Sequence, residues 1–136
     1  MAARHKARLW ALQILYRIEI NPEALETVFD DFRQTLDADP QAFQFTTELV
    51  HGVREQLTAL DAMIEQTAAN WRVARMSVTD RNILRLGVYE LLHRPDVPPL
   101  AAIDQAITLA KKFGSEESGK FVNGILDRIH HQRKDS

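Results

Sequence analysis

The feature that most constrains the fold of this chain is the spacing of its apolar residues, which recur three and four positions apart along each long segment. This spacing gathers apolar side chains on one face of an α-helix, whereas a half-buried β-strand needs strict alternation. No segment combines such alternation with β-branched residues and hairpin turns. The sequence therefore predicts an all-α fold, with helices over residues 4–20, 22–36, 40–71, 77–94 and 101–113 and a final helix after Ser115.

Turn and capping residues divide these helices into two groups. The Asn21-Pro22 pair stops the first helix, and Asp39-Pro40 starts the third, because proline disfavours helix before it and suits the first helical position. Ser77 begins the next start signal, Ser-Val-Thr-Asp. We expect an N-terminal helical bundle over residues 1–76 and a C-terminal helical bundle over residues 77–136.

The same pattern makes two finer predictions about the N-terminal bundle. Its third helix runs to Trp71 with at most a local bend near Gly52. Its first helix turns one apolar stripe inward, formed by Leu9, Leu12, Leu15, Tyr16 and Ile20.

A tight connection between two helices follows residue 113. Gly114 stands where a left-handed C-terminal cap would lie, and Ser115 can cap the next helix. Glu116 and Glu117 then occupy its first turn, where negative charge is favourable. Lys120 and Phe121 are left beside this corner, which we interpret as a surface for an anionic ligand.

Residues 114–120 also match a phosphate-binding Walker loop up to its last position, but we reject the match. Phe121 stands where the motif needs a Ser or Thr hydroxyl for magnesium, and two carboxylates occupy the loop. The preceding segment has a helical period, whereas a Walker loop follows a buried strand.

The composition excludes several classes of protein. The chain has no cysteine, so a disulfide framework, a cysteine zinc site or a thiol nucleophile is impossible. No apolar run is long enough to span a membrane, and the N-terminus lacks the uncharged core of a secretory signal. We expect a cytoplasmic protein.

The net charge of −2 is unevenly distributed along the chain. Residues 1–20 and 71–136 are basic, whereas residues 21–70 carry two arginines against ten acidic residues. Such asymmetry is compatible with an acidic partner or nucleic acid at the two basic ends, but charge alone favours an ordinary solvated surface.

No residue pattern indicates catalysis or a resident ligand. No nucleophile motif or bracketed pair of acidic residues is present, so we expect a binding protein rather than an enzyme, with no cofactor. No two histidines have the i, i+4 spacing of helical metal ligands, and we expect no metal site at His5, His51, His93, His130 or His131.

The first helix carries the clearest binding signal. Arg4, Lys6 and Arg8 precede Trp10, and Gln13 follows on the exposed side. Basic side chains neutralise RNA phosphates, while aromatic and amide side chains stack on bases and bond their edges. The pattern therefore suits RNA, but an exposed basic first turn is common and Trp10 fits a core position equally well, so this pattern alone does not favour nucleic-acid binding.

Several motifs resemble the NusB family of transcription antitermination factors over almost the whole chain. The resemblance begins with the basic start of the chain and the pattern Ala-x-Gln-x-Leu-Tyr at residues 11–16. It continues with Leu-Val-His-Gly-Val at 49–53, Ile-Leu-Arg-Leu at 83–86 and Tyr-Glu-Leu at 89–91. Asp-Val-Pro at 96–98, Phe-Gly at 113–114 and Lys-Phe-Val-Asn-Gly-Ile-Leu-Asp at 120–127 complete it.

The resemblance implies two packed three-helix bundles and an RNA-binding adaptor without catalytic activity. It implies pairing with the ribosomal protein NusE on single-stranded boxA RNA of nascent ribosomal RNA transcripts, within the transcription elongation complex. The family includes monomers and homodimers, so both oligomeric states stay open. By position, partner contacts fall on Tyr16 and Asp80, and RNA contacts fall on Arg4, His5, Lys6, Arg8, Gln13, Arg85, Glu117, Lys120 and Phe121.

Three alternatives remain at this point. A domain of the same fold precedes the catalytic domain of ribosomal RNA cytosine methyltransferases, but we expect no such enzyme here because the chain lacks an α/β domain with a glycine-rich cofactor turn. A helical protein-protein adaptor could instead use the acidic middle block without binding RNA. Finally, Phe121 could pack in the core rather than stack on RNA, because Val122 and Ile125 lie nearby.

Overall fold

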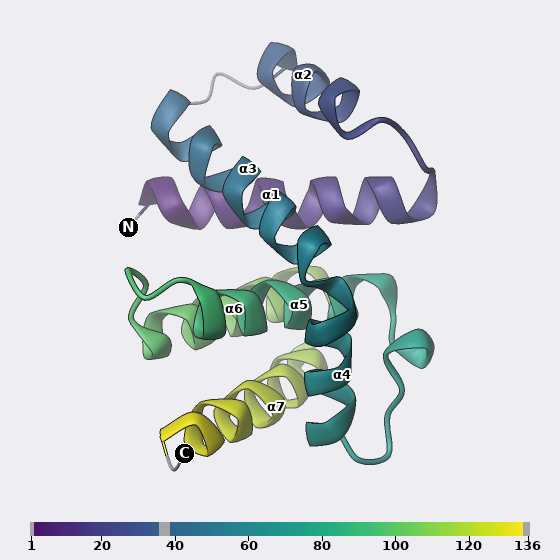
Figure 1. Ribbon diagram of the computed structural model, residues 1–136, viewed down its shortest axis with the longest axis vertical. Coiled ribbons are helices and arrows are strands. Elements are labelled where there is room, and N and C mark those ends of the chain that lie inside the picture. The colour runs from purple at the N-terminus through teal and green to yellow at the C-terminus, as the bar shows by residue number, and fades with distance from the viewer. Residues whose placement is uncertain (1, 36–38, 135–136) are drawn as a thin grey trace. The chain divides into compact units, whose positions relative to one another are not determined.

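The computed structural model describes residues 2–35 and 39–134, so the last residue of the predicted second helix, Leu36, lies outside the described residues. All regular secondary structure in these residues is helical, which confirms the all-α prediction. None of these helices is long and apolar enough to cross a membrane. Figure 1 labels the α-helices, which are α1 (Ala2–Ile20), α2 (Leu25–Thr35), α3 (Pro40–Glu55), α4 (Leu57–Thr67), α5 (Val78–His93), α6 (Pro99–Phe113) and α7 (Glu116–Lys134). A short 3-10 helix, η1 (Val73–Arg75), lies between α4 and α5.

The chain divides into two compact units, residues 1–52 and 53–136, whereas the sequence suggested a division after residue 76. Helix α4 packs against α5 and α7 and so belongs to the second unit. The prediction of an unbroken third helix is wrong, because α3 ends at Glu55 and α4 begins at Leu57. Between them Gln56 has φ −102° and ψ 13°. No proline or glycine stands at the break itself; Gly52, near which the sequence predicts a bend, lies four residues earlier.

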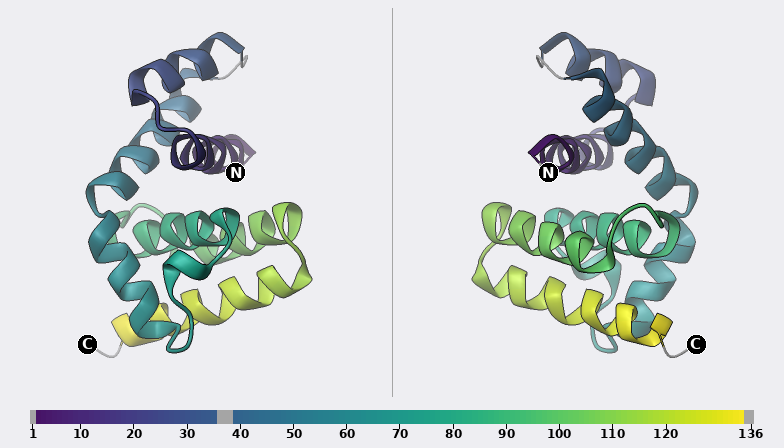
Figure 2. Two further views of the ribbon diagram at one scale, coloured as in Figure 1. Left: turned by 90° about the vertical axis from the view of Figure 1, so that its right-hand side faces the viewer. Right: turned by 90° about the vertical axis from the view of Figure 1, so that its left-hand side faces the viewer.

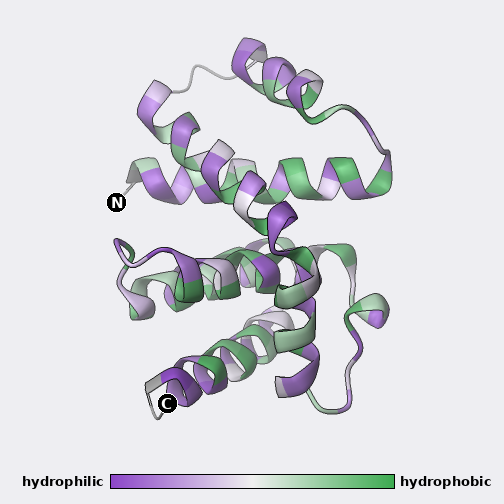
Figure 3. Ribbon diagram, viewed as in Figure 1, coloured by the Kyte–Doolittle hydropathy of each residue, from purple (hydrophilic) through white to green (hydrophobic). Residues whose placement is uncertain are grey.

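The core of the first unit is built from apolar residues of α1, α2 and α3. The Phe29 and Phe43 rings meet edge to face with centroids 6.1 Å apart, and Trp10 lies 6.2 Å from Phe43. The Thr46 hydroxyl donates to the Ala7 carbonyl oxygen at 3.0 Å, which satisfies a buried side chain and joins α3 to α1. Figure 3 shows that each helix carries both hydrophobic and hydrophilic residues, as amphipathic packing requires.

The prediction for the inward face of α1 is correct in part. Leu12 and Leu15 are buried as predicted, whereas Tyr16 and Ile20 are 46% and 58% exposed. Leu9 is half-buried.

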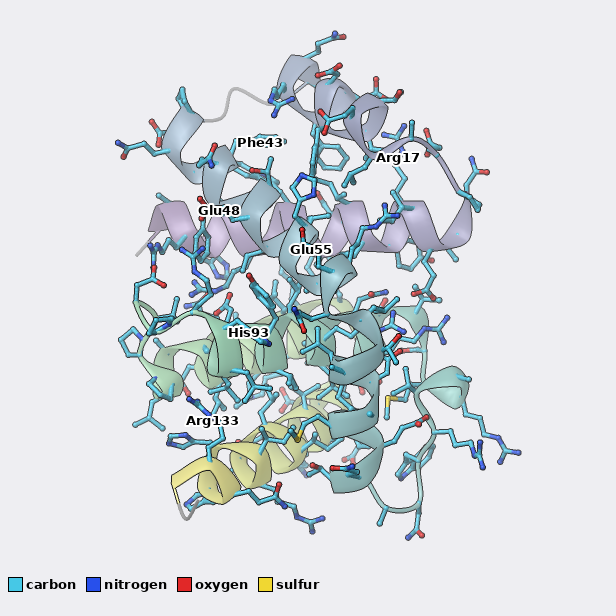
Figure 4. The ribbon with its side chains drawn as sticks, in the orientation of Figure 1. Arg17, Phe43, Glu48, Glu55, His93 and Arg133 are labelled. Atoms are coloured by element: carbon cyan, nitrogen blue, oxygen red, sulfur yellow. The ribbon has the colours of Figure 1, made fainter. Side chains whose placement is uncertain are left out.

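Arg17 ties α1 to the next segment of the first unit (Figure 4). Its guanidinium donates to both carboxylate oxygens of Glu23 at 2.8 Å and to Asp31 of α2 at 2.7 Å. The hydrogen bond from Arg17 lowers the pKa of the Glu23 carboxyl below its ordinary value, and the bonds from Glu23 and Asp31 raise the pKa of Arg17. This ion pair holds the α1–α2 connection, in which α2 begins at Leu25 rather than at the predicted Pro22.

The second unit packs α4, α5, α6 and α7 together, and the views in Figure 2 show α6 and α7 lying side by side. Ser77 caps α5 as predicted, because its hydroxyl accepts the Asp80 backbone N–H at 3.0 Å. Proline is at the first helical position of α6, which starts at Pro99, two residues before the predicted Ala101.

The corner between α6 and α7 contains only Gly114 and Ser115. The Ser115 hydroxyl accepts the Ser118 backbone N–H at 3.2 Å, which confirms the predicted cap. The left-handed conformation predicted for Gly114 is wrong, since no described glycine has a positive φ. Space explains the glycine instead, because a Cβ there would lie 2.9 Å from the Ala110 carbonyl oxygen and 2.5 Å from the Ser118 hydroxyl. Helix α6, not a strand, precedes the corner, in agreement with the rejection of a Walker loop.

Candidate nucleic-acid interface

The predicted RNA residues of α1 divide between two faces of that helix. Lys6 and Gln13 are exposed and lie seven residues apart, about two turns along one face. Arg4 and Arg8 lie four residues apart on another face, where both guanidinium groups cover the Phe45 ring of α3, 4.3 Å and 5.5 Å from its centroid. The structure therefore does not gather these residues into one exposed patch.

The burial of Arg8 separates it most clearly from its neighbours. Arg8 is 7% exposed, whereas Arg4 and His5 are half-buried. An arginine stacked on an aromatic ring contributes packing as well as charge. The position of Arg8 thus favours a role in the fold of the first unit over contact with a phosphate.

In the second unit, Arg85 joins α5 to α4. Its guanidinium donates to both carboxylate oxygens of Asp61, at 2.8 Å and 2.9 Å, and to the Asn82 side-chain oxygen at 3.2 Å. The Arg85 side chain is 11% exposed. A bidentate, poorly exposed pair of this kind fixes the side chain, so Arg85 acts here as a link between helices.

Lys120 and Glu117 lie at the start of α7 and, unlike Arg85, are highly exposed. Their side chains are 75% and 84% exposed and form an ion pair of 3.6 Å. Exposed pairs of this type contribute little stability, so Lys120 can exchange its carboxylate for a phosphate. The carboxylate of Glu117 can accept hydrogen bonds from the N–H groups of a base.

Phe121 is half-buried and contacts the exposed Trp71. The two rings meet edge to face with centroids 5.7 Å apart and an interplanar angle of 70°. Both rings line a hollow of about 330 Å³, together with Asp80, Glu117 and Ser118. The sequence placed Lys120 and Phe121 beside this corner correctly, but it missed Trp71 as part of the same surface.

The two predicted partner residues differ in accessibility. Tyr16 is 46% exposed, and Ile20, one turn further along α1, adds to its apolar surface. Asp80 lies in the first turn of α5, with one carboxylate oxygen 3.5 Å from the Ser118 hydroxyl. Its other carboxylate oxygen is enclosed and has no hydrogen-bond partner among the residues that the structure describes. Asp80 is therefore less accessible than Tyr16.

The side chains of these surfaces define a class of protein. Basic, aromatic and amide groups are exposed on α1 and at the start of α7, and in residues 2–35 and 39–134 no cluster of His, Asp or Glu could hold a metal ion. The arrangement is that of a small all-helical binding protein.

Comparison with known proteins identifies the family. The NusB family model matches residues 5–131. The transcription antitermination protein NusB of Myxococcus xanthus (strain DK1622) is 46% identical over 133 residues, which cover 95% of each chain. The chain therefore belongs to the NusB family of transcription antitermination proteins, which are not enzymes.

Solved structures agree with this assignment. T. maritima NusB is similar with a TM-score of 0.84 and 40% identity, over 94% of this chain and 90% of that one. A structure of the antitermination factors NusB and NusE in complex with double-stranded RNA is similar with a TM-score of 0.87 and 29% identity, over 97% of this chain and 98% of that one.

Proposed function

We propose that this chain is an RNA-binding transcription antitermination factor that pairs with NusE on boxA RNA of nascent ribosomal RNA transcripts. It acts in the cytoplasm as part of the transcription elongation complex. Family membership supports the proposal, and so does the similar structure in which NusB, NusE and RNA form one complex.

The observation that carries the proposal is the pairing of charge and ring at the start of α7. Lys120 is exposed beside the half-buried ring of Phe121, which can hold a phosphate and a base of the same nucleotide. Lys6 and Gln13 supply a second exposed basic and amide pair on α1. We assign RNA contacts to these four residues and to Glu117, and weaker contacts to the half-buried Arg4 and His5.

Arg8 and Arg85 have other partners within their own units, so we assign them supporting roles. The RNA in the similar NusB and NusE complex is double-stranded. Stacking on Phe121, however, needs a base that is free of its own helix, so single-stranded RNA fits this surface better.

For NusE we propose contacts at Tyr16 and Asp80. An exposed aromatic side chain is typical of protein interfaces, and Ile20 extends the apolar surface beside Tyr16. Asp80 lines the hollow beside Phe121, where the negative charge of its carboxylate attracts a basic side chain of the partner.

A titration of a boxA-type single strand, with and without NusE, tests the function. We expect weak RNA binding by the chain alone and tighter binding with NusE, and the same gain in NusE affinity when RNA is present. Equal RNA affinity with and without NusE would refute the cooperative pairing. NusE binding without salt-dependent RNA binding would identify a protein-only adaptor, and sedimentation of the free chain separates a monomer from a homodimer that covers the RNA surface.

A further inference from the structure

The segment between α4 and α5 carries a large aromatic side chain that stays exposed instead of packing into the core of the second unit. Trp71 is 54% exposed although its edge-to-face contact with Phe121 fixes its orientation. A large ring that is held in place and still exposed is a ready surface for stacking, because little conformational freedom remains to be lost.

Two arginines follow Trp71 closely on the same short segment. Arg72 immediately precedes η1, and Arg75 is its last residue, so the one-turn helix places both beside Trp71. The three side chains line a hollow of about 390 Å³ with Glu65 and Asn70. In the part of the chain that the structure describes, neither guanidinium has an ion-pair partner, and Glu65 accepts the Val73 backbone N–H at 2.9 Å.

Charge differs between the two hollows that meet at Trp71. The hollow on the side of Arg72 has two guanidinium groups against one carboxylate. The hollow on the side of Phe121 has Asp80 and Glu117 against Arg75 alone. Phosphate is therefore favoured on the first side and disfavoured on the second, where carboxylates accept hydrogen bonds from base N–H groups.

We propose that Trp71, Arg72 and Arg75 form a second nucleotide-binding position next to Phe121. A base of single-stranded RNA stacks on Trp71, and the adjoining phosphate lies against Arg72 and Arg75. This inference rests on the proposed RNA-binding function and extends it, because the RNA then continues from the start of α7 onto the segment before α5.

Tryptophan fluorescence tests the stacking directly, because the chain has two tryptophans. Trp10 lies in the first unit beside Phe43, so Trp10→Phe leaves Trp71 as the single reporter and Trp71→Phe is the matched control. A boxA-type single strand is expected to quench the emission of the Trp10→Phe protein and to leave that of the Trp71→Phe protein nearly unchanged. The opposite result would overturn the proposal.

Affinity and salt dependence test the energetic part. Trp71→Ala is expected to weaken RNA binding about five- to 150-fold, and Trp71→Phe to recover most of it. Replacing Arg72 and Arg75 together with glutamine is expected to lower the log-log salt slope by about 1.4, from roughly 0.7 per contact. Arg54→Gln, at another exposed arginine, is the control and should leave the slope unchanged.

The outcomes separate this inference from the function on which it rests. If Phe121→Ala weakens RNA binding while the Trp71 and arginine variants do not, the second position is refuted and the function stands. If none of these variants changes RNA binding, the proposed function fails as well. If Trp71→Ala lost NusE binding but kept RNA binding, the ring would contact the protein partner instead. If Trp71→Ala lowered the urea midpoint and RNA did not quench the fluorescence of the Trp10→Phe protein, the ring would have a structural role only.

Discussion

Lys6 and Arg8 are two residues apart on α1, yet their surroundings predict opposite consequences of replacement. Lys6 is exposed, whereas Arg8 is 7% exposed with its guanidinium 5.5 Å from the centroid of Phe45. Lys6→Gln removes a charge that faces solvent. Arg8→Gln removes a buried planar cation from an aromatic ring.

The expected magnitudes follow from these contacts. Lys6→Gln should lower the log-log salt slope of RNA binding by about 0.7, with the free energy of unfolding within about 0.5 kcal/mol of the parent. Arg8→Gln should lower the free energy of unfolding by about 2 kcal/mol, the contribution of a desolvated cation and ring, and leave the salt slope unchanged.

Two measurements on the same proteins decide between the roles. Fluorescence anisotropy of a labelled boxA-type strand over a range of salt gives the slope, and urea unfolding gives the stability. Arg8→Lys is the matched control, because it keeps the charge but loses the flat guanidinium, and it should stay destabilised. A lower salt slope with an unchanged urea midpoint in Arg8→Gln would refute the packing argument and assign Arg8 to the RNA.

Three further predictions concern the other sites. Phe121→Ala should weaken RNA binding about tenfold with only a small shift of the urea midpoint; a large loss of stability with RNA affinity retained would instead make the ring a core residue. Asp80→Lys should slow and weaken association with NusE, measured by surface plasmon resonance, and leave RNA binding by the free chain nearly intact; equal loss of both would indicate misfolding. The hydrogen bond from Arg17 lowers the pKa of the Glu23 carboxyl in the folded protein. The ion pair therefore stabilises the fold above the ordinary pKa of 4.5, and this stabilisation is lost as the pH falls from 4.5 through the lowered pKa. Glu23→Gln should consequently show a smaller drop of the urea midpoint on acidification than the parent. An identical drop in both proteins would show that this ion pair does not contribute.

The sequence predicts those features that depend on near neighbours in the chain. The caps at Ser77 and Ser115 are correct because a cap needs only a hydroxyl and an N–H three residues later. The break at Gln56 escapes prediction at its exact position because the nearest residue that disfavours helix, Gly52, lies four residues earlier, and because the packing of α4 against α5 and α7 joins segments distant along the chain.

The candidate site shows the same limit. Arg4, Lys6 and Arg8 form one basic cluster in the sequence. The guanidinium groups of Arg4 and Arg8, however, stack on the ring of Phe45, which is distant along the chain. Trp71 is missed for the related reason that its neighbour Phe121 lies fifty residues further along the chain. Composition identifies the kinds of side chain that bind RNA, whereas contacts between distant segments decide which of them remain accessible.

The burial of Val122, directly after Phe121, has a consequence for the energetics of recognition. Val122 is 0% exposed and Ile125 is 5% exposed, so the core of the second unit fixes the backbone that carries the Phe121 ring. The protein side of the proposed RNA contact is thus preorganised, so the entropy lost on binding there falls mainly on the RNA. Substitutions that loosen the packing beneath this turn of α7 should weaken recognition through a larger entropic cost, without removing a single contact to the ligand.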